Sequence, residues 1–126
     1  MAQHILIVED EIAIRTMLTE VLEDEGYTVA AAANVDAGWS LLQTTRPNLI
    51  LCDLMMPRRT GREFYQHLRN AAQYAGIPII FMTALQPTQA DERLIGDLQH
   101  VPVLYKPISI PELLTVVEMF IASGEQ

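Results

Sequence analysis

The chain of 126 residues is long enough for one domain, at about 150 residues per domain, and too short for two. Half of its residues are hydrophobic and 19% are charged, which is typical of a globular protein and excludes a disordered one. Its 8 basic and 16 acidic residues give a net charge of −8, so the average field disfavours nucleic acids and anionic membranes and favours a cationic or metal-assisted partner.

The first half of the chain alternates continuous apolar runs with apolar residues at helical spacing. An uninterrupted apolar run is typical of a strand that is buried on both faces, whereas helical spacing indicates a helix with one buried side. Asn34 is a suitable helix N-cap, and Gly26 is a suitable helix end. The elements expected here are a strand over 5–8, a helix from about 14 to 26, a strand over 28–32, a helix that begins after Asn34 and a strand over 48–53.

The second half continues this alternation after a turn-like segment over 57–61. Pro78 lies at the start of a strand, where a missing N–H donor is tolerated, and Ser109 and Glu112 have the spacing of a capping box. The elements expected here are a helix that carries Phe64, Leu68 and Ala72 and runs to Gly76, a strand over 77–83, a polar helix over about 88–96, a strand over 101–105 and a last helix that opens at 109–112 and buries residues up to Ile121.

Five successive strand–helix units predict an α/β fold, namely a doubly wound, five-stranded parallel sheet with right-handed crossovers and five helices on its two faces. We expect the flavodoxin-like strand order 2-1-3-4-5. One domain should cover 1–122, followed by a short C-terminal tail over 123–126. No basic leader opens the chain and no apolar run approaches the roughly 18 residues of a membrane span, so we expect a cytoplasmic protein without membrane contact.

Polar residues end or directly follow four of the five predicted strands. In chain order they are Glu9, Asp10, Asp53, Thr83 and Lys106, the only lysine of the chain. The carboxyl ends of parallel strands share one edge of the sheet, and ligands bind in the crevice at that edge. Because the first and third strands are neighbours in the expected order, the three carboxylates should lie together.

Three carboxylates at one edge require a cation, because two unit charges about 4 Å apart repel by roughly 4 kcal/mol at an effective dielectric constant of about 20. Oxygen ligands suit Mg²⁺, which binds one or two carboxylates, keeps several waters and accepts a phosphate oxygen. Lys106 supplies a second positive charge, and the Thr83 hydroxyl can donate a hydrogen bond. This set of groups indicates phosphoryl transfer, in which a carboxylate oxygen attacks in line.

The segments around these residues resemble the receiver domain of two-component response regulators over essentially the whole chain. They are ILIVEDE, LCDLMMP with Gly61 after it, MTA at Thr83 and YKP at Lys106. The resemblance implies that 1–122 is a receiver domain that acts in signal transduction, within a two-component regulatory system or phosphorelay. It also implies that Asp53 accepts a phosphoryl group from a phosphohistidine on a histidine kinase or a histidine phosphotransfer protein.

The resemblance further implies a metal site and no other cofactor. Asp10 and Asp53 would bind Mg²⁺ directly, and Glu9 would bind it mainly through water. The backbone carbonyl of Met55 would be a further ligand.

The resemblance also implies which residues contact the phosphoryl group and which transmit the signal to a downstream protein. Lys106 would contact the phosphoryl group and form a cis peptide bond with Pro107. Thr83 would shift toward the phosphorylated Asp53 and switch a protein-interaction face. The chain would catalyse only its own phosphorylation and slow dephosphorylation, and so would not be an enzyme in the usual sense. The downstream protein target is not indicated, and pairing of two phosphorylated copies is left open.

Two departures from the family pattern concern the transmission of the signal and the hydrolysis of the aspartyl phosphate. Receiver domains commonly carry an aromatic residue or histidine three residues before the lysine, and here Val103 occupies that position. The residues two beyond Asp53 and two beyond Thr83 are Met55 and Leu85, and neither can orient an attacking water by hydrogen bonding. We therefore expect slow hydrolysis of the aspartyl phosphate.

Other interpretations remain beside this one. Asp10 alone could favour a helix N-terminus, and the buried-looking Cys52 reads as a small hydrophobe that points away from Asp53. A constitutive receiver-like interaction domain, not controlled by phosphorylation, is the main alternative function. A hydrolase of the haloacid dehalogenase type needs a second acid where Met55 stands. No glycine-rich turn supports nucleotide binding, and no basic face supports direct contact with nucleic acid.

Overall fold

The computed structural model describes residues 3–85 and 101–124. Within these ranges five strands form one parallel sheet in the order β2-β1-β3-β4-β5, which confirms the predicted order. The strands are β1 (His4–Val8), β2 (Thr28–Ala32), β3 (Leu49–Asp53), β4 (Ile79–Thr83) and β5 (Val103–Tyr105). The helices among the described residues are α1 (Ile12–Asp24), α2 (Val35–Leu42), α3 (Gly61–Asn70) and α4 (Ile110–Gly124). The polar helix predicted over 88–96 lies outside the described residues.

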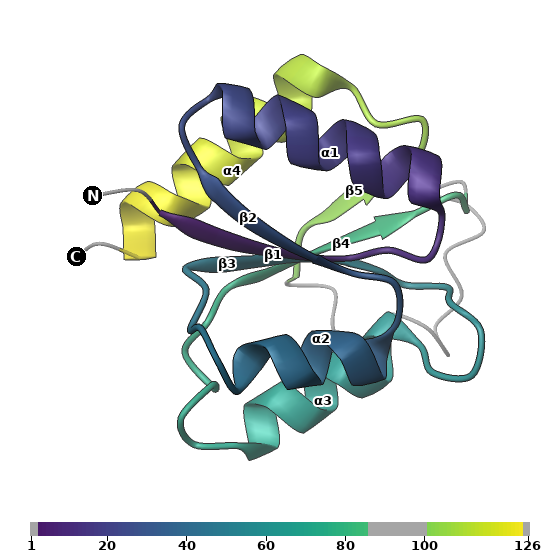
Figure 1. Ribbon diagram of the computed structural model, residues 1–126, viewed down its shortest axis with the longest axis vertical. Helices are drawn as coiled ribbons and strands as arrows, with labels where there is room; N and C mark the ends of the chain where they lie inside the picture. The colour runs from purple at the N-terminus through teal and green to yellow at the C-terminus, as the bar shows by residue number, and fades with distance from the viewer. Residues whose placement is uncertain (1–2, 86–100, 125–126) are drawn as a thin grey trace.

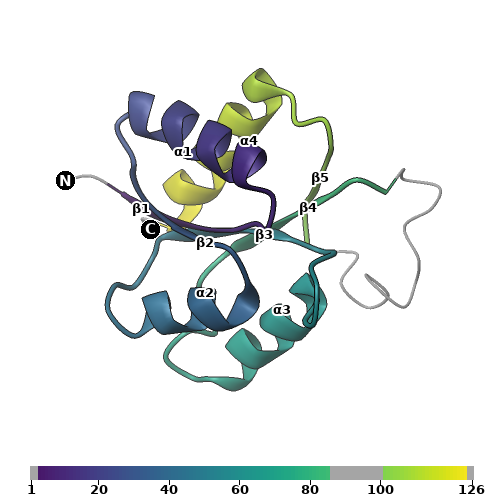
Figure 2. The same cartoon turned by 45° about the vertical axis from the view of Figure 1, so that its right-hand side comes forward.

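The sheet is covered on both faces. Figures 1 and 2 show α1 and α4 on one face and α2 and α3 on the other. Successive strand residues point to opposite faces, so each strand supplies both cores. The core below α2 and α3 includes Leu6, Ile50 and Phe81, and the core below α1 and α4 includes Ile7, Leu51 and Met82. Each of these buried side chains contributes about 1.5–3 kcal/mol relative to an exposed one.

Continuous apolar runs of the sequence form the central strands of the sheet. β3 and β4 are buried at every position, because neighbouring strands cover both edges and helices cover both faces. β4 and β5 are shorter than predicted and begin after Pro78 and Pro102. Neither proline can donate to the ladder, but both carbonyls accept, from Ile50 N at 3.0 Å and from Phe81 N at 2.9 Å.

The prediction that the third helix runs to Gly76 is wrong, because α3 ends at Asn70. Ala71 has an extended backbone, and the chain then turns so that the ring of Tyr74 is buried. The Tyr74 hydroxyl donates to the carbonyl of Leu42 at 3.3 Å, and its ring lies 5.5 Å from that of Trp39. Burial of the Tyr74 ring therefore stabilises the fold more than further turns of α3 would.

Polar side chains and glycine define the other helix ends. Asn34 accepts a hydrogen bond from Ala37 N at 2.8 Å, which confirms the predicted N-cap of α2. The Ser109 hydroxyl accepts from Glu112 N at 3.4 Å at the start of α4. α1 ends at Asp24, and Gly26 follows with a φ of 97°, which glycine adopts without strain. No helix among the described residues is both long and apolar enough to cross a membrane.

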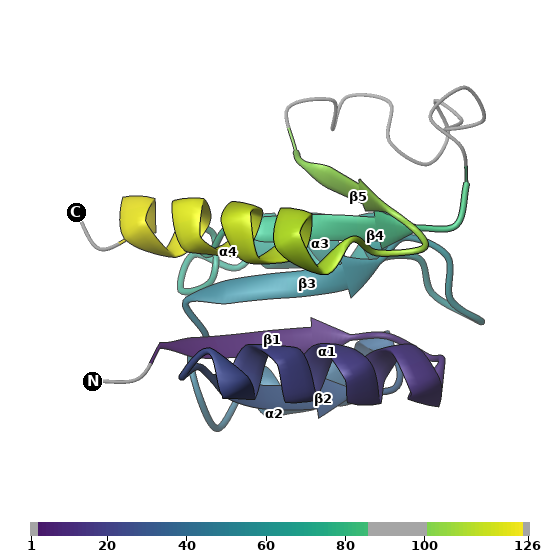
Figure 3. The same ribbon diagram turned by 90° about the horizontal axis from the view of Figure 1, so that it is seen from above.

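The arrangement brings the ends of distant strands to one edge. In Figure 3 the arrowheads of β1, β3, β4 and β5 lie at the same side of the sheet. The loops that leave this edge therefore come from positions near residues 9, 54, 84 and 106. Asp53 and Thr83 are the last residues of β3 and β4, and Glu9, Asp10 and Lys106 lie in the loops that follow β1 and β5.

Candidate functional site

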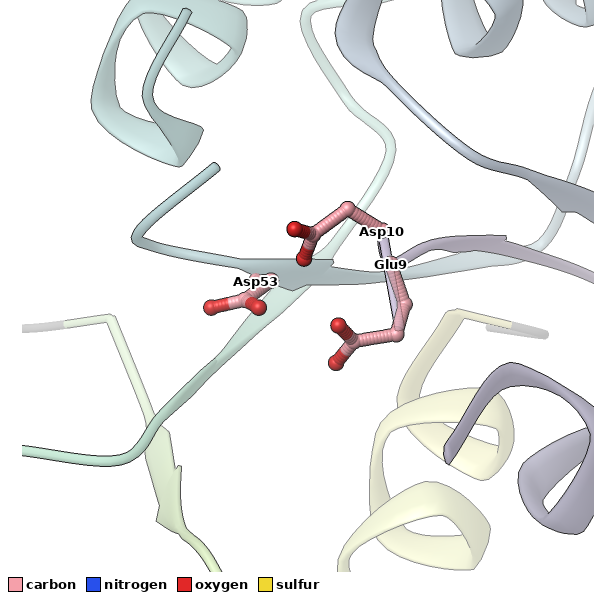
Figure 4. A group of neighbouring side chains, drawn as sticks. All are labelled: Glu9, Asp10 and Asp53. Atoms are coloured by element: carbon pink, nitrogen blue, oxygen red, sulfur yellow. The ribbon is translucent and has the colours of Figure 1, made fainter. Parts of the chain in front are cut away.

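The three acids predicted to meet do so. Glu9 and Asp10 directly follow β1, and Asp53 ends β3, whose register places Val8 beside Cys52. One carboxylate oxygen from each acid lies within 4.8 Å of the others. Figure 4 shows the three side chains around a common space. Glu9 is 0% exposed and Asp53 is 3% exposed, whereas Asp10 faces solvent, so the cluster is open on one side.

Lys106 joins this cluster from the far side of β4. Its Nζ lies 2.8 Å from Glu9 Oε1, 3.0 Å from Asp53 Oδ2 and 3.9 Å from Glu11 Oε1. Its backbone N–H donates to Thr83 O at 2.7 Å, which ties the loop after β5 to the end of β4. The Lys106–Pro107 peptide bond is cis, which confirms that expectation.

Burial shapes the protonation of these groups. Burial raises the pKa of Glu9 from 4.5 to about 7, and the charge of Asp53 adds to the rise. The Lys106 ammonium and the backbone N–H of Glu11 act in the opposite direction. Burial works to lower the pKa of Lys106, but its contacts with Glu9 and Asp53 outweigh this effect and raise it. Lys106 is therefore charged at neutral pH.

The donor set fits a magnesium ion. One ammonium offers a single positive charge to three clustered carboxylates, so the cluster retains negative charge when all three are ionised. The available ligand atoms are hard oxygens, and one side of the cluster is open for water or phosphate. These features match the ligands and the partial hydration that Mg²⁺ prefers.

A backbone contact that the sequence did not reveal orients Asp53. The N–H of Met55 donates to Asp53 Oδ1 at 3.0 Å, while Lys106 holds Oδ2. Both oxygens of Asp53 are thus fixed before any ligand binds. Met55 lies in the loop after β3 with its side chain half exposed. The role of its carbonyl as a metal ligand stays a prediction.

Thr83 ends β4 and is fully buried. Its hydroxyl accepts from Leu85 N at 3.2 Å. Thr83 pairs in register with Tyr105 and Phe81 with Val103, so the residue beside Thr83 on β5 is aromatic. The movement of Thr83 on phosphorylation stays a prediction.

Two other residues near Asp53 have structural roles. Cys52 is fully buried in the core below α2 and α3, which confirms that it points away from Asp53. Burial raises the pKa of its thiol well above the usual value, so it is protonated and unreactive. Gly61 begins α3 against the backbone of Asp53, and a Cβ there would lie 2.6 Å from the Asp53 carbonyl oxygen.

Sequence comparisons agree with this geometry. A family model described as "Response regulator receiver domain" matches residues 5–118. Response regulator Rre1 of Synechocystis is 35% identical over 120 residues, which cover 94% of this chain and 51% of that protein. Phosphate regulon transcriptional regulatory protein PhoB of Escherichia coli is 39% identical over 84 residues, which cover 67% of this chain and 37% of PhoB. The chain spans about half the length of these curated relatives, or less.

Solved structures agree as well. Chemotaxis response regulator CheY4 of Vibrio cholerae superposes with a TM-score of 0.85 at 29% identity, over 95% of this chain and 99% of that chain. The receiver domain of sensor histidine kinase PA1611 from Pseudomonas aeruginosa has a TM-score of 0.86 at 26% identity, over 97% of this chain and 99% of its own. That structure holds a magnesium ion in its active site cleft.

Proposed function

The chain belongs to the response regulator receiver domain family, and we propose that it accepts a phosphoryl group on Asp53 from the phosphohistidine of a partner protein. The observation that carries this proposal is the position of Asp53. Its carboxylate is buried at a strand end, held at one oxygen by Lys106 and at the other by Met55 N, and clustered with Glu9 and Asp10. A carboxylate fixed in this way is oriented as a nucleophile.

Within this proposal the three acids hold Mg²⁺. Asp10 and Asp53 bind it directly, Glu9 binds it mainly through water, and the carbonyl of Met55 completes the set. Bound Mg²⁺ supplies positive charge that reduces repulsion between the carboxylates and the incoming phosphoryl oxygens.

The transfer exchanges one bond to phosphorus for another. An oxygen of Asp53 forms a bond to phosphorus as the bond to the imidazole nitrogen of the donor histidine breaks, and the electron pair stays on that nitrogen. Lys106 exchanges its contact with Asp53 Oδ2 for one with the transferred phosphoryl oxygens. Its contacts with Glu9 and Asp53 raise its pKa, so Lys106 is charged when the phosphoryl group arrives. Lys106 therefore stabilises the negative charge that arrives with the phosphoryl group.

Thr83 links the site to the rest of the protein in this proposal. Its hydroxyl now accepts from Leu85 N, and on phosphorylation it would donate to the phosphoryl group instead. That exchange would pull on the loop after β4 and alter a face that a downstream protein reads. The chain would catalyse only its own phosphorylation and slow dephosphorylation.

Several properties of the chain beyond the phosphorylation site stay predictions. They include the cytoplasmic location, the pairing of phosphorylated copies and the absence of direct nucleic acid contact by this domain. PhoB is named a transcriptional regulatory protein, and the matched segments cover 51% of Rre1 and 37% of PhoB.

Intact mass spectrometry after incubation with phosphoramidate and Mg²⁺ tests the proposal. We expect wild type to gain one phosphoryl group and Asp53→Asn to gain none. Asp36→Asn is the matched control, because Asp36 is an exposed acid on α2 whose partner is Arg59. A wild-type chain that stays unmodified with and without Mg²⁺ would instead favour the constitutive interaction domain.

A further inference from the structure

Arg15 in the first turn of α1 reaches back to the loop that carries two of the acids. Its Nη1 donates to Glu9 O at 2.8 Å and to Asp10 O at 3.4 Å. The first carbonyl belongs to the peptide that precedes Asp10, and the second to the peptide that follows it. A single guanidinium therefore fixes the backbone on both sides of Asp10.

Asp10 depends on its backbone more than the other two acids do. The Glu9 carboxylate contacts Lys106 and accepts from Glu11 N at 3.1 Å, and Asp53 is held by Lys106 and Met55 N. Over residues 3–85 and 101–124, nothing hydrogen-bonds the exposed Asp10 carboxylate. The direction of the Asp10 side chain is thus set mainly by the orientation of the two peptide groups that flank it.

We propose that Arg15 is a positioning residue for the metal site, which holds Asp10 in the orientation that binds Mg²⁺. This inference rests on the proposed function, because it assumes that the acids bind Mg²⁺. Arg15 contacts the backbone carbonyls of Glu9 and Asp10 and not the carboxylate groups that would bind Mg²⁺. It acts through the Glu9 and Asp10 carbonyls in the way that outer groups around a metal site orient its ligands.

The sign of the effect separates positioning from simple charge. A positive guanidinium near the acids repels Mg²⁺, so an effect of charge alone predicts that Arg15→Met binds Mg²⁺ more tightly and that Arg15→Lys binds it as wild type does. Positioning predicts weaker binding in both variants. Both hydrogen bonds come from Nη1, and a lysine keeps the charge but places its nitrogen one bond closer to the helix backbone, away from the two carbonyls.

Calorimetric titration with Mg²⁺ alone tests this on the full chain. We expect the dissociation constant to rise about tenfold in Arg15→Lys and in Arg15→Met, the lower end of the range for such outer groups. Arg46→Lys and Arg46→Met are matched controls, because Arg46 Nη1 also donates to a backbone carbonyl, that of Gln73, in a loop away from the acids. Both controls should bind Mg²⁺ as wild type does.

Thermal unfolding of the same proteins in a chelator checks that each variant is folded. If Arg15→Met fails to fold, Arg15→Lys decides the question. Wild-type affinity in Arg15→Lys, or tighter binding in Arg15→Met, would overturn the positioning role while leaving the proposed function intact. A wild-type chain that takes up no Mg²⁺ would overturn both.

Discussion

Glu9 is a fully buried acid whose proton affinity differs between the folded and unfolded chain. Its pKa rises from 4.5 to about 7 on folding, so the folded state binds this proton more tightly. The stability that results is fully present below pH 4.5 and is lost as the pH rises through about 7. The physical cause is the cost of burying the charged Glu9 carboxylate, which the contacts with Lys106 and Glu11 N only partly offset.

The raised pKa of Glu9 predicts that the difference in stability between wild type and Glu9→Gln changes with pH. With a chelator present, the free energy of unfolding of wild type should fall relative to that of the variant as the pH rises from 4.5 to about 7. Urea denaturation at a series of pH values measures it. Parallel curves for the two proteins would mean that Glu9 is not the group responsible.

Met55 and Leu85 set the expected lifetime of the phosphorylated state. The Met55 side chain is half exposed beside Asp53, and Leu85 is half-buried beyond Thr83. Neither side chain can orient a water for attack on an acyl phosphate. We expect Met55→Asn combined with Leu85→Glu to release phosphate faster than wild type, as followed by the loss of the phosphoryl group from the intact mass. An unchanged half-life would rule out this explanation.

At the residue scale the sequence predicted the identity of the site better than its internal contacts. Glu9, Asp10, Asp53 and Lys106 were found because polar residues interrupt apolar strands at their ends. The hydrogen bond from Met55 N could not be found in this way, because any residue other than proline offers the same backbone N–H. The same holds for the carbonyls of Glu9 and Asp10 that Arg15 contacts.

Among the elements, α3 begins in close contact with the backbone at the end of β3. Gly61 N donates to Leu54 O at 3.0 Å, and a Cβ on Gly61 would lie 2.6 Å from Asp53 O and 3.0 Å from Leu54 Cα. These neighbours are backbone atoms that cannot rotate away. A side chain at this position therefore has to move either the helix or the strand end.

We expect Gly61→Ala to lower the free energy of unfolding by about 1–3 kcal/mol, the usual cost of overpacking a close contact. Gly76→Ala is the matched control, because a Cβ there meets nothing within 4 Å. Urea denaturation of both variants gives the comparison. Equal stability of the two variants would show that the contact relaxes at no cost.

Element boundaries were less predictable than element types. The alternation of apolar runs and helical spacing identified the described strands and helices, because it reflects which side chains are buried. The end of α3 was missed because the burial of Tyr74 against Trp39 and Leu42 involves residues more than 30 positions away. Such a tertiary contact leaves no local mark on the sequence around Asn70.

At the scale of the whole molecule, topology makes the site possible. The order β2-β1-β3-β4-β5 places the end of β1 beside that of β3, and Lys106 reaches across from beyond β4. Residues separated by as many as 97 positions thus surround one space. The apolar patterns predicted a parallel sheet, and the expected order is one of the few arrangements that doubly wound sheets adopt.

The most direct measurement is borohydride reduction of the phosphorylated chain, followed by peptide mapping. Borohydride reduces an aspartyl phosphate to homoserine, so the position of the new residue marks the phosphorylated acid. We predict homoserine at position 53 alone, and only when the phosphodonor was added together with Mg²⁺. Reduction at another acid, or the same yield of homoserine in a chelator, would contradict a magnesium-dependent phosphoacceptor at Asp53.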